Sequence, residues 1–230
     1  MKIAGVPTRP IRFDPDRPDV LQVIDQRQLP HRFLWQDLMD LEAAAWAIEA
    51  MVVRGAPLIG ATAAMGMVLA ARSVQTQPDF RETLHAAADR LLRTRPTAVN
   101  LQWAIAQQLA VLTDCDSGAI ALERLQANAV NLMENDVQQC AQIGEHGVGL
   151  IEAIYARTGK TVNILTHCNA GWLACVDWGT ATSPMYQAFD RQIPIHVWVD
   201  ETRPRNQGAK LTAWELGQHL SLIHISQPIR

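Results

Sequence analysis

The feature that most constrains the fold is a change of pattern after Gly159. The β-branched run from Val162 to Leu165 is typical of a buried strand, and the run from Ile193 to Asp200 begins a second one. Between them, the residues from Tyr186 to Arg191 have the pattern of a helix. Strands that alternate with helices indicate parallel βαβ topology, so we expect an open α/β domain in this part of the chain.

The chain before this point has mostly helical periodicity. An exception is the alternating stretch from Val20 to Asp25, which predicts an edge strand of a small sheet. Helices are predicted over residues 41–52 (with Asp40 as the N-cap), 58–73, 79–93, 98–112, 117–139 and 143–158. The predicted class is therefore α/β, with a mainly helical domain and a small N-terminal sheet over residues 1–158. The α/β domain follows over residues 159–220, with the boundary near 155–160.

Composition narrows the function classes. A hydrophobic content of 48% and a charged content of 19% are typical of an ordinary soluble globular protein. A net charge of −3 provides no basic surface, so we expect no nucleic-acid partner. The longest apolar run, Leu58 to Ala71, is too short to cross a bilayer, and the N-terminus lacks a signal segment. Four cysteines without regular spacing argue against a disulfide framework or a zinc site, which favours a reducing cytoplasm.

Cys168 is the candidate reactive residue. It follows the first predicted strand among the turn formers Thr166, Asn169 and Gly171, at the strand end where open α/β sheets bind their ligands. A helix that starts just beyond it would favour the thiolate. The alternative interpretation is a buried structural cysteine, which we expect for Cys175.

Histidines offer little to this site. His167 adjoins Cys168, but neighbouring residues on an extended strand point to opposite faces, so we expect no Cys–His dyad. The other histidines show no metal-ligand spacing.

Arginines precede two of the predicted helices. Arg54, Gly55 and Ala56 lie before Pro57, and Arg95 lies in a similar break before a proline. A guanidinium beside the free N–H groups of a helix start is suited to phosphate, although a solvated connector between helices is the alternative. Gln207, in the polar stretch after the second strand, is a further candidate for binding sugar hydroxyls or phosphate.

Four motifs occur in an order and spacing that resemble one known family. They are Met51–Pro57 with Ile59-Gly60, Arg95–Leu101, Thr166–Gly171, and Glu201–Pro204 with Gln207–Leu216. The chain is similar, over about residues 15 to 220, to the methylthioribose-1-phosphate isomerases of methionine salvage. These belong to a wider family that includes the regulatory subunits of the translation initiation guanine-nucleotide exchange factor.

The resemblance implies an aldose–ketose isomerase that converts 5-methylthioribose 1-phosphate to 5-methylthioribulose 1-phosphate. It implies a Rossmann-like second domain and a homodimer without metal or nucleotide cofactor. Residues carried over by motif are Cys168 as the catalytic thiol, and Arg54, Gly55, Ala56, Arg95 and Gln207 as the substrate-binding residues. Hydrogen transfer by an enediolate and by a hydride shift both remain open. The alternatives are a regulatory exchange-factor-like subunit and a ribose 1,5-bisphosphate isomerase.

The end of the sequence departs from this family. The Gly-Ala-Asp-Arg motif that carries its second catalytic group is absent, as is an Asn-Lys pair, and residues 221–230 do not resemble it. We therefore expect a C-terminally truncated chain with a non-native tail and an incomplete Rossmann-like domain. Without the acid/base aspartate, this chain is expected to be inactive.

Overall fold

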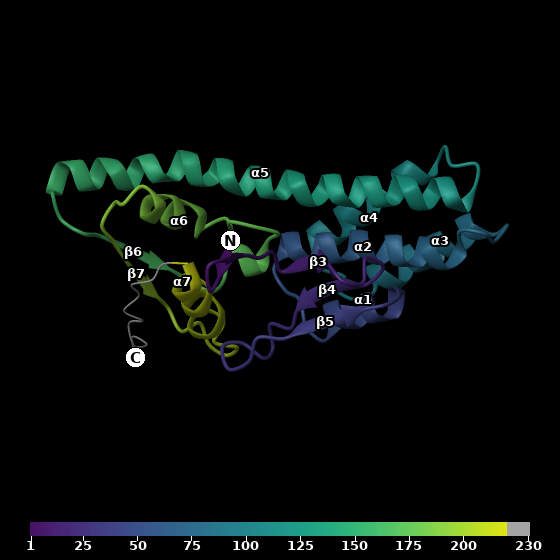
Figure 1. Ribbon diagram of the computed structural model, residues 1–230, viewed down its shortest axis with the longest axis horizontal. Helices are drawn as coiled ribbons and strands as arrows, with labels where there is room; N and C mark the ends of the chain where they lie inside the picture. Colours follow the sequence, from purple (N-terminus) through teal and green to yellow (C-terminus); the bar gives the residue numbers. More distant parts are fainter. Residues whose placement is uncertain (220–230) are drawn as a thin grey trace. The chain divides into compact units, whose positions relative to one another are not determined.

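The structure is a computed structural model that describes residues 1–219, so the predicted tail at 221–230 lies outside the described residues. The chain divides into two compact units (Figure 1). The helical unit comprises Ile11–Arg27 and Leu34–Asn135, and the thiol unit comprises Met1–Pro10, Gln28–Phe33 and, within the described residues, 136–219. The domain ranges 1–158 and 159–220, which rest on sequence patterns, stay a prediction.

The helical unit begins with a small antiparallel sheet. Its strands are β3 (Ile11–Phe13), β4 (Leu21–Ile24) and β5 (Trp35–Leu38), in the order β3-β4-β5. The strand predicted over Val20 to Asp25 is confirmed, but its placement at an edge is wrong. β4 pairs on both sides, which makes it the central strand, and its four residues are all buried.

Four helices complete the core of this unit, and each was predicted. They are α1 (Leu41–Glu49), α2 (Ala56–Val74), α3 (Phe80–Leu92) and α4 (Val99–Leu112). Asp40 caps α1 as expected, because its carboxylate accepts a hydrogen bond of 2.8 Å from the backbone nitrogen of Ala43.

Helix α2 is longer than the apolar run suggested. By length and composition Ala56–Val74 is able to cross a membrane, so the prediction that the apolar run is too short to do so is wrong. Of its most apolar segment, however, 83% is buried inside the protein. Its small residues admit close neighbours: a Cβ on Gly60 would stand 3.0 Å from the carbonyl oxygen of Asn100. The composition of α2 is thus accounted for by its place in the core of the helical unit.

A single long helix replaces the two predicted over 117–139 and 143–158. Helix α5 runs unbroken from Gly118 to Thr158, because no proline interrupts it. Gly144 and Gly147 are accommodated where α6 (Ser183–Asp190) packs on α5, and a Cβ on Gly147 would stand 2.5 Å from the Pro184 ring. The helix passes from the helical unit to the thiol unit between Asn135 and Asp136.

The thiol unit contains the predicted βαβ arrangement, which confirms the α/β class. β6 (Val162–Thr166) and β7 (Ile195–Val199) are parallel and are joined through α6. Thr166 pairs with Val199, so both strands end at the same edge. The strands are not buried on both faces as predicted: Leu165 is 64% exposed and Trp198 is 42% exposed.

Short elements complete this unit. They are the hairpin β1 (Lys2–Ile3) and β2 (Val6–Pro7), the 3₁₀ helix η1 (Trp172–Ala174), the π-helix η2 (Gly208–Thr212) and α7 (Ala213–His219). On one face of the sheet, Val162 of β6 packs with Val148 and Ile151 of α5 and with Ala188 of α6 in a small apolar core.

Candidate functional site

Cys168 lies two residues beyond β6 in a backbone conformation that side chains rarely adopt. Its φ is +60°, and hydrogen bonds hold the peptide groups on both sides. Its backbone nitrogen donates to Oγ1 of Thr202 at 2.9 Å, and its carbonyl oxygen accepts from Oγ1 of Thr212 at 2.6 Å. A strained residue that is held this firmly is typical of functional sites.

The sulfur of Cys168 contacts the amide of Gln207. Sγ donates to Oε1 of Gln207 at 3.3 Å, and the cysteine is partly exposed, so the buried structural alternative does not describe it. The two residues meet because β6 and β7 are parallel and end at one edge, as the sequence argument expected. The structure thus brings together Cys168 and Gln207, two of the predicted site residues.

The helix start beside the thiol is not the one expected. Only the single turn of η1 follows Cys168, whereas the helical segment that begins near the sulfur is η2, whose N-cap residue is Gln207. The residue after Gln207 packs so closely against the end of β7 that only glycine fits there. A Cβ on Gly208 would stand 1.8 Å from the carbonyl oxygen of Asp200. π-Helical turns such as η2 are frequent at functional sites.

His167 is directed away from the thiol, as predicted. Its Nδ1 lies 3.0 Å from Oδ2 of Asp200, and its side chain is exposed. Cys168 and His167 therefore engage different partners.

The loop of residues 167–170, which carries Cys168, is here called the thiol loop. The residues that support it were not predicted from the sequence. Asn169, which is buried, donates through Nδ2 to Oγ1 of Thr212 at 3.0 Å, which continues the chain of hydrogen bonds from Cys168. Both Thr202 and Thr212 lie within the motifs of the resemblance, so their presence there was the available signal.

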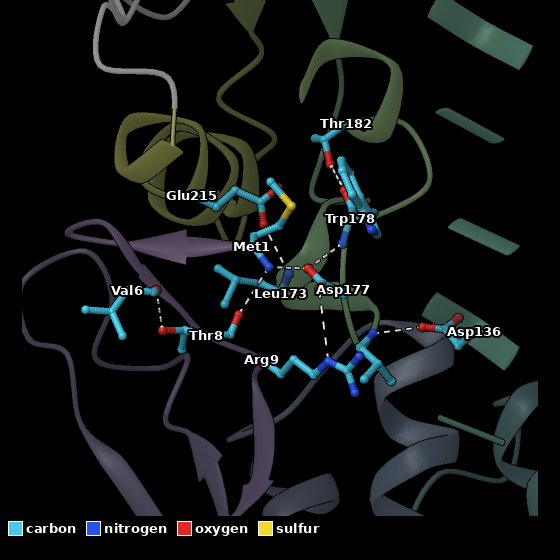
Figure 2. Close-up of polar contacts among 11 residues, drawn as sticks. Met1, Val6, Thr8, Arg9, Asp136, Leu173, Asp177, Trp178, Thr182 and Glu215 are labelled. Atoms are coloured by element: carbon cyan, nitrogen blue, oxygen red, sulfur yellow. Dashed lines mark hydrogen bonds and ion pairs between the residues drawn. The ribbon is translucent and has the colours of Figure 1, made fainter. Parts of the chain in front are cut away.

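A buried carboxylate supports the turn that follows. Glu215 on α7 accepts a hydrogen bond of 3.1 Å from the backbone nitrogen of Leu173 (Figure 2). It occupies the space that a side chain at Gly171 would need. Burial, reinforced by the charge of Glu215, raises the pKa of the Tyr186 hydroxyl far above its ordinary value. The thiol loop is therefore backed by a packed polar core and is not a free surface segment.

The second group of predicted residues lies in the helical unit. Gly55 precedes α2 as its N-cap with φ +90°, a conformation that favours glycine, and Pro57 occupies the first turn. Arg54 is buried with 7% of its surface exposed, so it is not the solvated connector residue of the alternative interpretation. The first turn of α2 carries no acidic residue, which leaves its N–H groups suited to an anion.

Arg95 precedes α4 in the same way and is partly exposed. The two helices pack in parallel: Gly60 approaches Asn100, and further along both helices Nε2 of Gln108 donates to the carbonyl oxygen of Ala64 at 2.9 Å. The starts of α2 and α4 therefore lie at the same end of the helical unit. Two helix N-termini, each preceded in the sequence by an arginine, therefore share one end of the helical unit, a combination that is chemically suited to an anion.

Comparison with known proteins identifies the family. The model of the initiation factor 2 subunit family matches residues 52–222. The chain belongs to the initiation factor 2 subunit family. The match includes both groups of candidate residues, from Arg54 to Gln207.

Curated relatives within this family are named methylthioribose-1-phosphate isomerases. The protein from Rhodospirillum centenum is 54% identical over 220 residues, which are 95% of this chain and 57% of the relative. That from Desulfosudis oleivorans is 51% identical over 213 residues, which are 92% of this chain and 58% of the relative. The chain thus spans less than three-fifths of the length of either relative.

Solved structures of family members have the same fold. The 5-methylthioribose 1-phosphate isomerase from Pyrococcus horikoshii aligns with a TM-score of 0.83 and 32% identity, over 96% of this chain and 60% of that one. The translation initiation factor eIF-2B delta subunit from A. fulgidus aligns with a TM-score of 0.84 and 36% identity, over 96% and 62%.

Proposed function

We propose that this family member, at the length of its relatives, is an aldose–ketose isomerase that converts 5-methylthioribose 1-phosphate to 5-methylthioribulose 1-phosphate. The observation that carries the proposal is the contact of 3.3 Å between the Cys168 thiol and the Gln207 amide at the end of two parallel strands. The names of the relatives at 54% and 51% identity supply the substrate.

The proposed roles follow from the chemistry of each group. Arg54 and Arg95, with the backbone of Gly55 and Ala56, bind the phosphate, because they combine cationic side chains with free helix-start N–H groups. Gln207 orients the sugar, and Cys168 is the catalytic thiol. A phosphate on C1 prevents simple ring opening, so the reaction needs an acid and a base placed at the sugar.

We further propose a homodimer for the longer protein, a cytoplasmic location, and no metal or nucleotide cofactor for the isomerisation.

A second function is favoured by one observation, the similarity to the exchange-factor subunit structure from A. fulgidus. A regulatory subunit of that kind would have no need of a partly exposed thiol at the end of β6. A ribose 1,5-bisphosphate isomerase is the remaining candidate.

The test is a chimera in which residues 1–219 continue into the C-terminal part of the Rhodospirillum centenum relative. Assayed with both sugars, it should isomerise 5-methylthioribose 1-phosphate and leave ribose 1,5-bisphosphate largely unchanged. Preference for the bisphosphate would favour the third function. A folded chimera without activity on either sugar would favour the regulatory subunit and contradict the proposal.

A further inference from the structure

Three potential metal ligands meet in the thiol unit, away from Cys168. They are the carboxylate of Asp136 and the thiols of Cys140 and Cys175, and their ligand atoms all lie within 4.8 Å of one another. Asp136 and Cys140 are four residues apart on α5, so they share one face of the helix. Cys175 directly follows η1 and lies beside these two residues, although it is 35 residues beyond Cys140 in the sequence.

We propose that Asp136, Cys140 and Cys175 form a binding site for a thiophilic divalent cation of the zinc type. The inference is independent of the proposed isomerase function, which assigns no role to these residues.

The ligand set and its spacing suit such an ion. Sγ of Cys140 lies 3.9 Å from Oδ1 of Asp136. Ligands at zinc–sulfur and zinc–oxygen distances around one tetrahedral ion stand about 3.5 to 4 Å apart, so small movements would complete the site. Two thiolates with one carboxylate select borderline-soft ions over magnesium or calcium.

The carboxylate is oriented as a ligand would be. Oδ2 of Asp136 accepts a hydrogen bond of 2.8 Å from the backbone nitrogen of Val176, drawn as the dashed line at Asp136 in Figure 2. The other carboxylate oxygen, Oδ1, is the one that lies near Cys140. Outer contacts of this kind fix the orientation of metal ligands. Asp136 is partly exposed, which gives an ion a path to two thiols that are closed to solvent.

The surroundings make these three groups costly to ionise when no cation is bound. Ala174 and Trp178 pack around the two cysteines. The neighbouring Cys140, together with burial, raises the pKa of the Cys175 thiol, and burial raises the pKa of Asp136. The charges of Asp177 and Glu215 act in the same direction. A divalent cation would reverse this cost by taking two thiolates and releasing their two protons to solvent.

Within residues 1–219 no other histidine, cysteine, aspartate or glutamate joins this group. Three protein ligands with one open position are a known arrangement for zinc, in which water completes the tetrahedron. Cysteine spacing argued against a zinc site, because Cys140 and Cys175 have no motif spacing and meet only in the fold.

Cobalt(II) titration of the metal-free 230-residue chain, reduced with a phosphine under anaerobic conditions, tests the proposal. We expect one equivalent to bind with the strong visible absorption of tetrahedral cobalt and with thiolate-to-cobalt charge-transfer bands. Zinc should displace the cobalt and abolish both. Weak octahedral binding of cobalt by the reduced chain, or no binding, would overturn the proposal.

Variants locate the ion. Cys140→Ser and Cys175→Ser should lose the charge-transfer bands, and Asp136→Asn should weaken binding by about tenfold or more. Cys115→Ser, which removes a buried thiol of the helical unit, and Cys168→Ser should bind as the parent does. Circular dichroism shows whether each variant folds. If a serine variant does not fold, Asp136→Asn, which keeps both thiols, still tests whether the ion binds at this site. Unchanged binding in a folded Asp136→Asn chain would refute the three-ligand site.

Discussion

At the residue scale, two threonines determine where the Cys168 thiol lies. Thr202 binds the peptide nitrogen of Cys168 and Thr212 binds its carbonyl oxygen, at 2.9 and 2.6 Å. Each hydrogen bond contributes about 0.5–1.5 kcal/mol net, and a positive φ at a residue with a side chain costs about 1–3 kcal/mol. The two hydrogen bonds together therefore match the free-energy cost of the positive φ at Cys168, whereas one bond alone falls short of it.

Thr212→Val should consequently destabilise the chain by about 1–3 kcal/mol, because it removes the hydroxyl that donates to the carbonyl of Cys168 and accepts from the amide of Asn169. The free energy of unfolding in urea measures this loss. Thr158→Val at the exposed end of α5 is the matched control and should change stability by less than about 0.5 kcal/mol. Equal losses in the two variants would contradict the assigned role of Thr212.

Exposure also separates the four cysteines. Cys168 is partly exposed, whereas Cys115, Cys140 and Cys175 are buried. Iodoacetamide under native conditions should therefore alkylate one thiol, which peptide mass spectrometry should locate at Cys168. Faster modification of any of the other three would show that the thiol loop is not as accessible as described.

At the element scale, helix starts were the easiest features to predict, because capping is a local interaction. Asp40 and Asp79 both precede helices, but only Asp40 accepts a backbone hydrogen bond with its side chain. Asp40→Ala should cost about 1 kcal/mol in the free energy of unfolding, and Asp79→Ala much less. A larger loss at Asp79 would contradict the capping geometry.

The glycines of α5 differ in the space around them. A Cβ on Gly147 would stand 2.5 Å from the rigid Pro184 ring, whereas one on Gly149 would meet nothing within 4 Å. Gly147→Ala should destabilise the chain by about 1–3 kcal/mol through overpacking. Gly149→Ala should stabilise it by up to about 1 kcal/mol, because alanine favours the helix. Thermal unfolding of both variants checks the packing of α6 on α5, and a gain in stability at both positions would contradict it.

Local sequence patterns predicted some of the helices and strands but not others. The spacing of apolar residues was sufficient for α1 to α4, since each helix ends at a break of its own. It failed for α5, where the gap left between residues 139 and 143 is part of one continuous helix. It also misplaced β4 within its sheet, because strand order depends on partners that are distant in the sequence.

At the scale of the whole molecule, the candidate site was predictable only as far as topology allowed. Parallel strands imply that the ends of β6 and β7 meet, and Cys168 contacts Gln207 at this edge. The common end of α2 and α4 depends on their parallel packing, which local patterns do not encode. The grouping of Asp136, Cys140 and Cys175 is of the same long-range kind.

The central claim is that the Cys168 thiol performs chemistry on a sugar phosphate, and its most direct test is one rate. In the chimera with the Rhodospirillum centenum relative, turnover of 5-methylthioribose 1-phosphate should be measured for the parent and for Cys168→Ala. Loss of a positioned acid–base group lowers the rate by about 10²- to 10⁴-fold, and we expect a loss of that size with the fold retained. A Cys168→Ala chimera that turns over the sugar at the parental rate would contradict the account.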